Sequence, residues 1–164
     1  MVVIADASPL NYLVLIHQVG LLERLFAEVF VPDAVIEELS DSQAPSEVAS
    51  WVANLPRWVR RVGDPQFRSD PILDTLGRGE RSAISFADGL WPAVLLVIDE
   101  SKGRRAPLQR QIPVVGILGI LEAASVRGWI ELPPILADLQ RTNFRIAHNG
   151  NGLVRHKRII LRKR

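Results

Sequence analysis

Four acidic residues stand where the predicted strands and helices would bring carboxylates to one place. Asp6 and Asp99 each follow an apolar run that predicts a buried strand, while Glu38 lies near the end of a predicted helix and Glu80 near the start of another. Ligands of open α/β sheets bind at the carboxyl ends of strands. Converging carboxylates repel one another unless a cation lies between them, and oxygen ligands suit Mg²⁺ or Mn²⁺. These residues therefore predict metal-dependent cleavage of phosphodiesters.

Each acid also has an ordinary structural interpretation. Asp6 and Asp99 fit as turn residues, and Glu38, beside Glu37, fits as a surface residue. Glu80 in a first helical turn would complement the helix dipole. The two glycines just before Glu80 also allow a phosphate-binding loop, although this pattern without its neighbours is a weak signal. Together, however, the four acids favour one shared site.

Composition narrows the class of protein. The chain has 164 residues, 48% of them hydrophobic, which is enough for one folded core. It has no cysteine, so disulfides, zinc thiolates and thiol nucleophiles are excluded. No apolar run approaches the roughly 20 residues that span a membrane, and the first residues do not resemble a signal peptide. We therefore expect a soluble cytoplasmic protein with no membrane partner.

Charge is distributed unevenly along the chain. Asp138 is the last acidic residue, and eight of the 20 basic residues follow it. A basic tail on an acidic body favours attraction to a polyanion such as RNA. A solvated terminal helix is the alternative interpretation. We expect that deletion of residues 155 to 164 weakens RNA binding without affecting catalysis at saturating RNA.

Apolar runs alternate with amphipathic segments. The predicted strands cover residues 2–6, 29–31, 94–98 and 112–115, with an extended segment at 58–62. The predicted helices cover residues 8–17, 21–26, 32–39, 42–51, 76–90, 101–110, 116–127 and 133–140. This alternation predicts an α/β fold of three layers, α/β/α, with a central, mostly parallel sheet and with Asp6 and Asp99 on adjacent strands. Residues 1–146 form the predicted domain, and residues 147–164 a basic C-terminal tail.

Five segments together resemble a known family. They are the Asp-x-Ser after the first strand, Pro-x-x-Val-x-x-Glu-Leu at residues 32–39, Gly-x-Gly-Glu-x-x-Ala-Ile at residues 77–84, the acidic strand end and basic segment at residues 96–106, and Val-x-Gly-x-Leu-Gly at residues 114–119. The chain resembles the PIN domain, the metal-dependent ribonuclease fold of many prokaryotic toxins, over roughly residues 2 to 146. The second segment selects Glu38 rather than Glu37 as the site residue.

The resemblance implies roles for particular residues. Asp6 and Asp99 would ligate the first Mg²⁺ or Mn²⁺, Glu38 and Glu80 would bind through water or hold a second ion, and Glu100 could touch the metal. The substrate contacts expected beside them are Ser8, Lys102, Arg104 and Arg105. Two residues depart from the pattern: Glu100 stands where a second Asp is common, and Ile117 stands where Thr or Ser is usual.

The leading hypothesis is thus an endoribonuclease of single-stranded RNA, compatible with the toxin of a toxin–antitoxin pair. The resemblance further implies a homodimer and a small antitoxin protein, docked on exposed apolar residues of the helices after Pro32 and Ser42. A catalytically inactive or inhibited PIN-fold binding module is the alternative. A phosphoacceptor receiver fits less well, because receivers carry an acidic pair after the first strand. Trp58 is interpreted as a packing residue, with base stacking as the minor alternative.

Overall fold

In the part of the chain that the structure describes, the central sheet has five strands, all parallel. In the computed structural model, which describes residues 1–66, 70–98 and 105–144, the strand order is β3–β2–β1–β4–β5. The strands are β1 (Val2–Ala5), β2 (Val29–Pro32), β3 (Val59–Val62), β4 (Val94–Val97) and β5 (Val114–Val115). β1 and β4 lie at the centre because they are apolar throughout, as strands covered on both faces must be.

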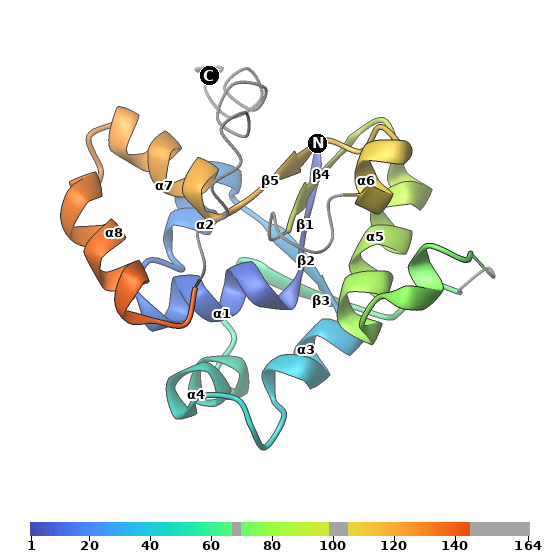
Figure 1. Cartoon of the computed structure of the whole chain (residues 1–164), viewed down its shortest axis with the longest axis horizontal. Coiled ribbons are helices and arrows are strands. Elements are labelled where there is room, and N and C mark those ends of the chain that lie inside the picture. Colours follow the sequence, from blue (N-terminus) through green and yellow to red (C-terminus); the bar gives the residue numbers. More distant parts are fainter. Residues whose placement is uncertain (67–69, 99–104, 145–164) are drawn as a thin grey trace.

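Helices cover both faces of this sheet. They are α1 (Ala7–Leu15), α2 (Leu21–Phe26), α3 (Asp33–Leu39), α4 (Ser46–Ala53), α5 (Arg78–Leu90), α6 (Arg105–Gln109), α7 (Ile117–Val126) and α8 (Leu132–Arg141), with a short 3₁₀ helix at Leu73–Thr75. In Figure 1, α1, α2 and α7 lie on one side of the strands and α5 and α6 on the other, with α8 packed outside α7. The predicted three-layer α/β/α class is confirmed.

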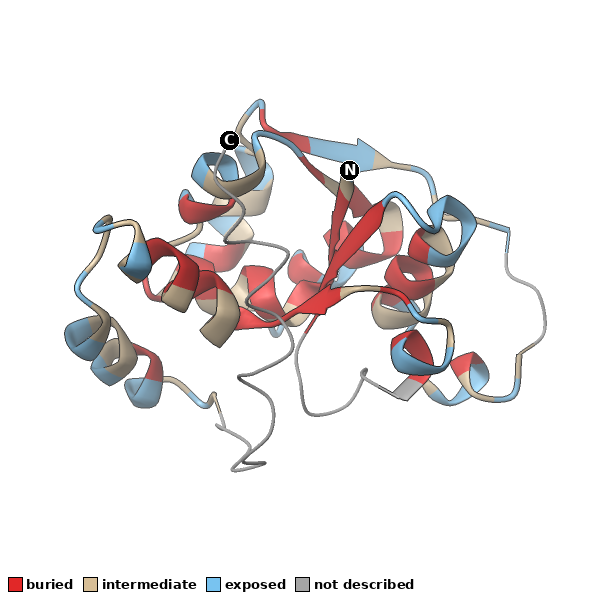
Figure 2. Cartoon of the chain, turned by 90° about the horizontal axis from the view of Figure 1, so that it is seen from above, coloured by how far each residue is buried: buried red, intermediate tan, exposed pale blue. Residues whose placement is uncertain are grey.

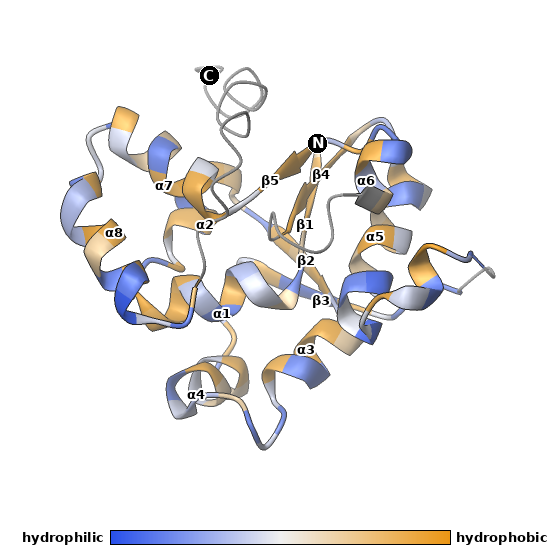
Figure 3. Cartoon of the chain, in the orientation of Figure 1, coloured by the Kyte–Doolittle hydropathy of each residue, from blue (hydrophilic) through white to orange (hydrophobic). Residues whose placement is uncertain are grey.

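Apolar residues gather between these layers. The inner strands are buried, whereas the edge strand β3 and the outer helix faces are exposed (Figure 2), and the hydropathy of the chain follows a similar division (Figure 3). Ile4, Leu95 and Leu96 of the two central strands are at most 1% exposed. No helix in the described ranges is long and apolar enough to cross a membrane.

The pairing of β1 with β4 fixes the position of the acidic site. The two strands run in register from Val2 beside Val94 to Ala5 beside Val97, and the Asp6 N–H donates to the Val97 carbonyl at 2.9 Å. From β1 the chain moves outward to β2 and β3, and then returns to the other side of β1 as β4 and β5. The direction of winding therefore reverses between β1 and β4. In open α/β sheets, a ligand crevice forms at such a switch point.

Several helices begin at residues other than those predicted. Asp6 is the N-cap residue of α1, so Ser8 lies in its first turn instead of capping it. α4 begins at Ser46, since Pro45 disfavours helical backbone in the residue before it, and the Asp41 carboxylate accepts the Gln43 N–H at 2.8 Å in a turn. The third change is at the site: α5 begins at Arg78, with Gly77 as its N-cap residue.

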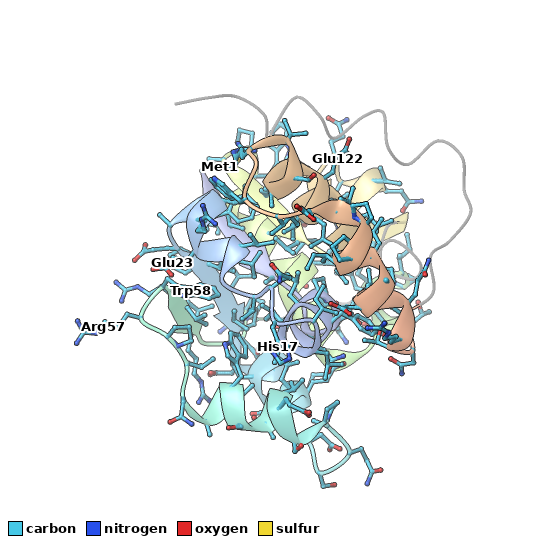
Figure 4. All side chains as sticks on the ribbon, turned by 90° about the vertical axis from the view of Figure 1, so that its left-hand side faces the viewer. Met1, His17, Glu23, Arg57, Trp58 and Glu122 are labelled. Carbon is cyan, nitrogen blue, oxygen red and sulfur yellow. The ribbon has the colours of Figure 1, made fainter. Side chains whose placement is uncertain are left out.

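The edge strand β3 is anchored by an aromatic residue and bordered by charge. Trp58 is 8% exposed and packs against Trp51 with ring centroids 6.4 Å apart, which confirms the packing interpretation of Trp58. Figure 4 shows Trp58 turned toward the body of the protein and Arg57 pointing away from it. Along β3, Arg60 pairs with Glu28 at 3.2 Å, and Arg61 pairs with Asp33.

Candidate functional site

Asp6 is the one charged residue that is buried in the part of the chain that the structure describes, with 6% of its surface exposed. Burial is the main reason that its pKa rises from 3.8 to about 7, and the charges of Glu80 and Glu38 raise that pKa further. The backbone N–H groups of Ala7 and Ser8 oppose this shift. Two of the predicted site residues, Glu38 and Glu80, thus lie within electrostatic reach of a third, Asp6, at the switch point of the sheet.

Glu38 reaches this point because Gly79 has no side chain. The Glu38 carboxylate lies against the first turn of α5, where a Cβ on Gly79 would collide with Glu38 Oε2 and lie 3.5 Å from the Cα of Val35. Although Glu38 is exposed as a residue, partial desolvation raises the pKa of its carboxyl group. The glycine therefore serves a close approach between α3 and α5, which is an alternative to the phosphate-binding loop considered from sequence.

Glu80 stands one residue beyond Gly79 in the first turn of α5. The neighbouring acid on α3, Glu37, instead forms an ion pair with Arg78. Of the two adjacent glutamates, Glu38 is thus the one whose charge acts on Asp6. This placement agrees with the choice between them that the resemblance implied.

Asp64 ties these elements together, and sequence reasoning missed it. Its Oδ1 accepts the Ala34 N–H at 2.9 Å and the Ser82 hydroxyl at 2.7 Å, and its Oδ2 pairs with Arg78 at 3.2 Å. Burial opposes ionisation, but these three donors lower the pKa of Asp64 below its usual value. Asp64 therefore joins the start of α3 to the first turns of α5. The signal was an acid two residues beyond the extended segment at 58–62, much as Asp6 follows the first strand.

Of the other predicted site residues, the structure describes only Ser8 and the backbone of Arg105. Asp99, Glu100, Lys102 and Arg104, like the tail from residue 145, lie outside the described residues. Arg105 begins α6. Ser8 is half-buried at the start of α1, beside Asp6.

Ile117, where the family usually has a hydroxyl, is 2% exposed at the first position of α7. The departure therefore replaces a polar group with a residue of the core. Gly116 precedes it as the N-cap residue, without a side-chain cap.

The donor set fits a hard divalent cation. Asp6, Glu38 and Glu80 offer only carboxylate oxygens, which Mg²⁺ and Mn²⁺ prefer, and a cation among them would relieve the repulsion that raises the pKa of Asp6. Among residues 1–66, 70–98 and 105–144, no three acidic or histidine side chains are close enough to form a metal site by themselves. The ligand set predicted from sequence also includes Asp99, which is not among them.

Fold and site together define a three-layer α/β/α domain with an acidic centre at the carboxyl end of a parallel sheet. The model of the PIN-domain family DUF3368 matches residues 2–155, and the chain belongs to this family. The resemblance drawn from the five sequence segments is thereby confirmed. PIN domains are generally nucleases, and they generally use divalent metal ions. No curated protein matches the chain.

The raised pKa of Asp6 predicts how stability depends on pH in the metal-free protein. The unfolded chain loses this proton near pH 3.8 and the folded protein near pH 7, so folding is favoured less as pH rises through this window. At pH 8 the penalty is of the order of 4 kcal/mol at about 1.4 kcal/mol per pKa unit. We expect Asp6→Asn to raise the melting temperature at pH 8 and to change it little at pH 4. Thermal melting in chelator measures both, with Asp138→Asn as the exposed control; a lower stability of the Asp6→Asn variant at pH 8 contradicts the prediction.

Gly79→Ala tests the close approach of Glu38. The added methyl group displaces a flexible side chain, and alanine is the better helix former by about 1 kcal/mol, so stability should change by no more than about that amount. Displacement of Glu38 should weaken Mn²⁺ binding roughly 10- to 100-fold. Gly89→Ala, in the same helix but with open space around its Cβ, is the matched control. Calorimetric titration of Mn²⁺ compares them, and equal affinity in the two variants would show that Gly79 does not shape the site.

Asp64→Ala should destabilise the protein, because it leaves the buried Ser82 hydroxyl and the Ala34 N–H without their acceptor. Each unsatisfied group costs about 1–3 kcal/mol, whereas Asp138→Ala, which removes an exposed ion pair with Arg141, should cost at most about 1 kcal/mol. Because the folded-state pKa of Asp64 is lowered, its contribution is present above the unfolded pKa and is lost as pH falls through the folded value. Urea unfolding at pH 7 measures the difference between the two variants. Equal losses would mean that Asp64 is not an anchor.

Proposed function

We propose that the protein is a Mg²⁺- or Mn²⁺-dependent endoribonuclease that cleaves single-stranded RNA. The observation that carries the proposal is that Glu38 and Glu80 lie within electrostatic reach of the buried Asp6 at the switch point between β1 and β4. The charges of Glu80 and Glu38 add to the effect of burial in raising the pKa of Asp6, and its carboxylate adds nothing to the packing of the core. A cost of this kind is typical of a functional site.

The residues of the chain have separable roles in this proposal. The cation, when bound, supplies Lewis acidity and a water of lowered pKa. Asp6 offers a carboxylate on a backbone that the start of α1 and the β1–β4 pairing fix in place. Glu38 and Glu80 approach it from two helices that Asp64 and Arg78 fasten together. Asp99, directly after Ile98 in sequence, completes the predicted ligand set.

We extend the proposal to a homodimer held inactive by a small antitoxin protein, which rests on the resemblance to PIN-type toxins. The structure changes the surface we expect to be used. The large apolar residues that are exposed in the described part of the chain are not on α3 or α4. Outside Met1, they are Leu90, Trp91, Leu108 and Val126. A partner that uses apolar contacts would thus find them near the end of α5, on α6 and at the end of α7.

Purified protein should cleave single-stranded RNA in Mg²⁺ or Mn²⁺ and lose this activity in excess chelator. Asp6→Asn should lower activity by more than about a hundredfold, beyond the loss typical of a residue that only orients a ligand. Circular dichroism should show the fold intact, and Asp138→Asn should retain full activity. Equal cleavage in chelator would disprove the metal mechanism. Metal-induced stabilisation and RNA binding without cleavage would favour the inactive binding module.

A further inference from the structure

A pocket of about 350 Å³ adjoins the acidic centre. The N-terminal half of α1 forms one wall, and the end of α3 with the turn before α4 forms the other. Glu38 belongs both to the acidic centre and to this pocket, and Ala7 and Ser8 of the pocket directly follow Asp6. The volume lies in the range of sites that take small ligands. Whatever occupies the pocket therefore sits next to the reacting group.

The chemistry of the lining selects the kind of occupant. Ser8, Asn11 and Gln43 supply hydroxyl and amide groups, while Glu38 and Asp41 supply carboxylates; none of the lining residues is basic. An anionic phosphate would be repelled here. Amide groups both donate and accept hydrogen bonds, and carboxylates accept them from N–H groups. This set matches the edge of a neutral nucleobase, which presents donors and acceptors side by side.

The pocket is also shaped and held in place. Ser8, Asn11 and Tyr12 share one face of α1, being three and four residues apart. Tyr12 packs edge-on against Phe144, with ring centroids 5.0 Å apart, and so provides a fixed aromatic wall. Opposite, Asp41 accepts the Gln43 N–H at 2.8 Å, which fixes the turn. The side-chain amides of Asn11 and Gln43 have no hydrogen bond to another described residue, so both can turn toward a ligand.

We infer that this pocket binds the base of a nucleotide next to the scissile phosphate. The inference rests on the proposed function, because the metal-bound phosphate defines where that nucleotide lies. Asn11 and Gln43 contact the edge of the base, Tyr12 limits its position, and the phosphate stays at the acidic centre. The pocket thereby makes cleavage depend on the base at one position of the RNA.

Nucleosides test the pocket without involving catalysis, since they carry neither a phosphate nor a bond to cleave. Adenosine, guanosine, cytidine and uridine are titrated into the full-length protein, and backbone amide resonances are followed by NMR. We expect saturable shifts at residues 8–12 and 41–44. Asn11→Ala and Gln43→Ala should each raise the dissociation constant about three- to tenfold, as the loss of a hydrogen bond does. Alanine favours the helix at Asn11, so this variant should fold. Gln140→Ala, an exposed amide on α8, is the matched control.

Kinetics with single-stranded RNA provide the second readout. The two pocket variants should raise KM and leave kcat unchanged, because they remove binding shared by the ground state and the transition state. The inference is overturned if no nucleoside shifts the pocket, if both variants bind as the wild type does, or if N-acetyl-arginine amide binds there and nucleosides do not. Nucleoside binding without RNA cleavage would remove the proposed function and keep the pocket. Cleavage without nucleoside binding would do the reverse.

Discussion

The burial of the Asp6 carboxylate beside the charges of Glu80 and Glu38 is the constraint on which the rest of the structure depends. Asp6 is desolvated and faces the charges of Glu38 and Glu80, so the folded state either holds a proton there or needs a cation. Proton and cation compete for the same oxygens, and the pKa of about 7 sets that competition near neutral pH. The apolar β1 and β4, paired in register and buried on both faces, supply the stability that offsets this cost.

Glu38 and Glu80 can stay near Asp6 only if other residues hold α3 and α5 together against the repulsion between these acids. Asp64 and Arg78 do this on the outer side of the site, where they join α3, α5 and the end of β3 by hydrogen bonds and ion pairs. Gly79 contributes because it lacks a side chain: a Cβ at this position would displace the Glu38 carboxylate. Asp64, Arg78 and Gly79 are not proposed to bind metal or substrate. They nevertheless set how closely the proposed ligands Glu38 and Glu80 approach Asp6.

The layered fold could be predicted from the sequence alone, and so could the placement of Glu38 and Glu80 near Asp6. The apolar runs before Asp6 and Asp99 predict adjacent strands, because short apolar runs between amphipathic helices are typical of a buried parallel sheet, and β1 and β4 are adjacent. Asp64 and Asn11 were not predicted, since their importance arises from contacts between segments far apart in the chain. Asp64 lies in a stretch that looked irregular and becomes an anchor only when α3 and α5 meet over it. The roles of Asp99, Glu100, Lys102, Arg104 and the basic tail stay predictions.

The charged border of β3 bears on how copies of the chain can associate. An exposed sheet edge is a template on which another strand can add, and long apolar edges aggregate. Here one edge strand, β3, carries Arg60 and Arg61 on opposite faces, each already paired with an acid, and the other, β5, is only two residues long. A strand of a second chain that paired with β3 would have to break those ion pairs. A strand that paired with β5 would form very few backbone hydrogen bonds. In the part of the chain that the structure describes, both edges of the sheet thus disfavour strand addition, and helix faces are the better surface for contacts between copies.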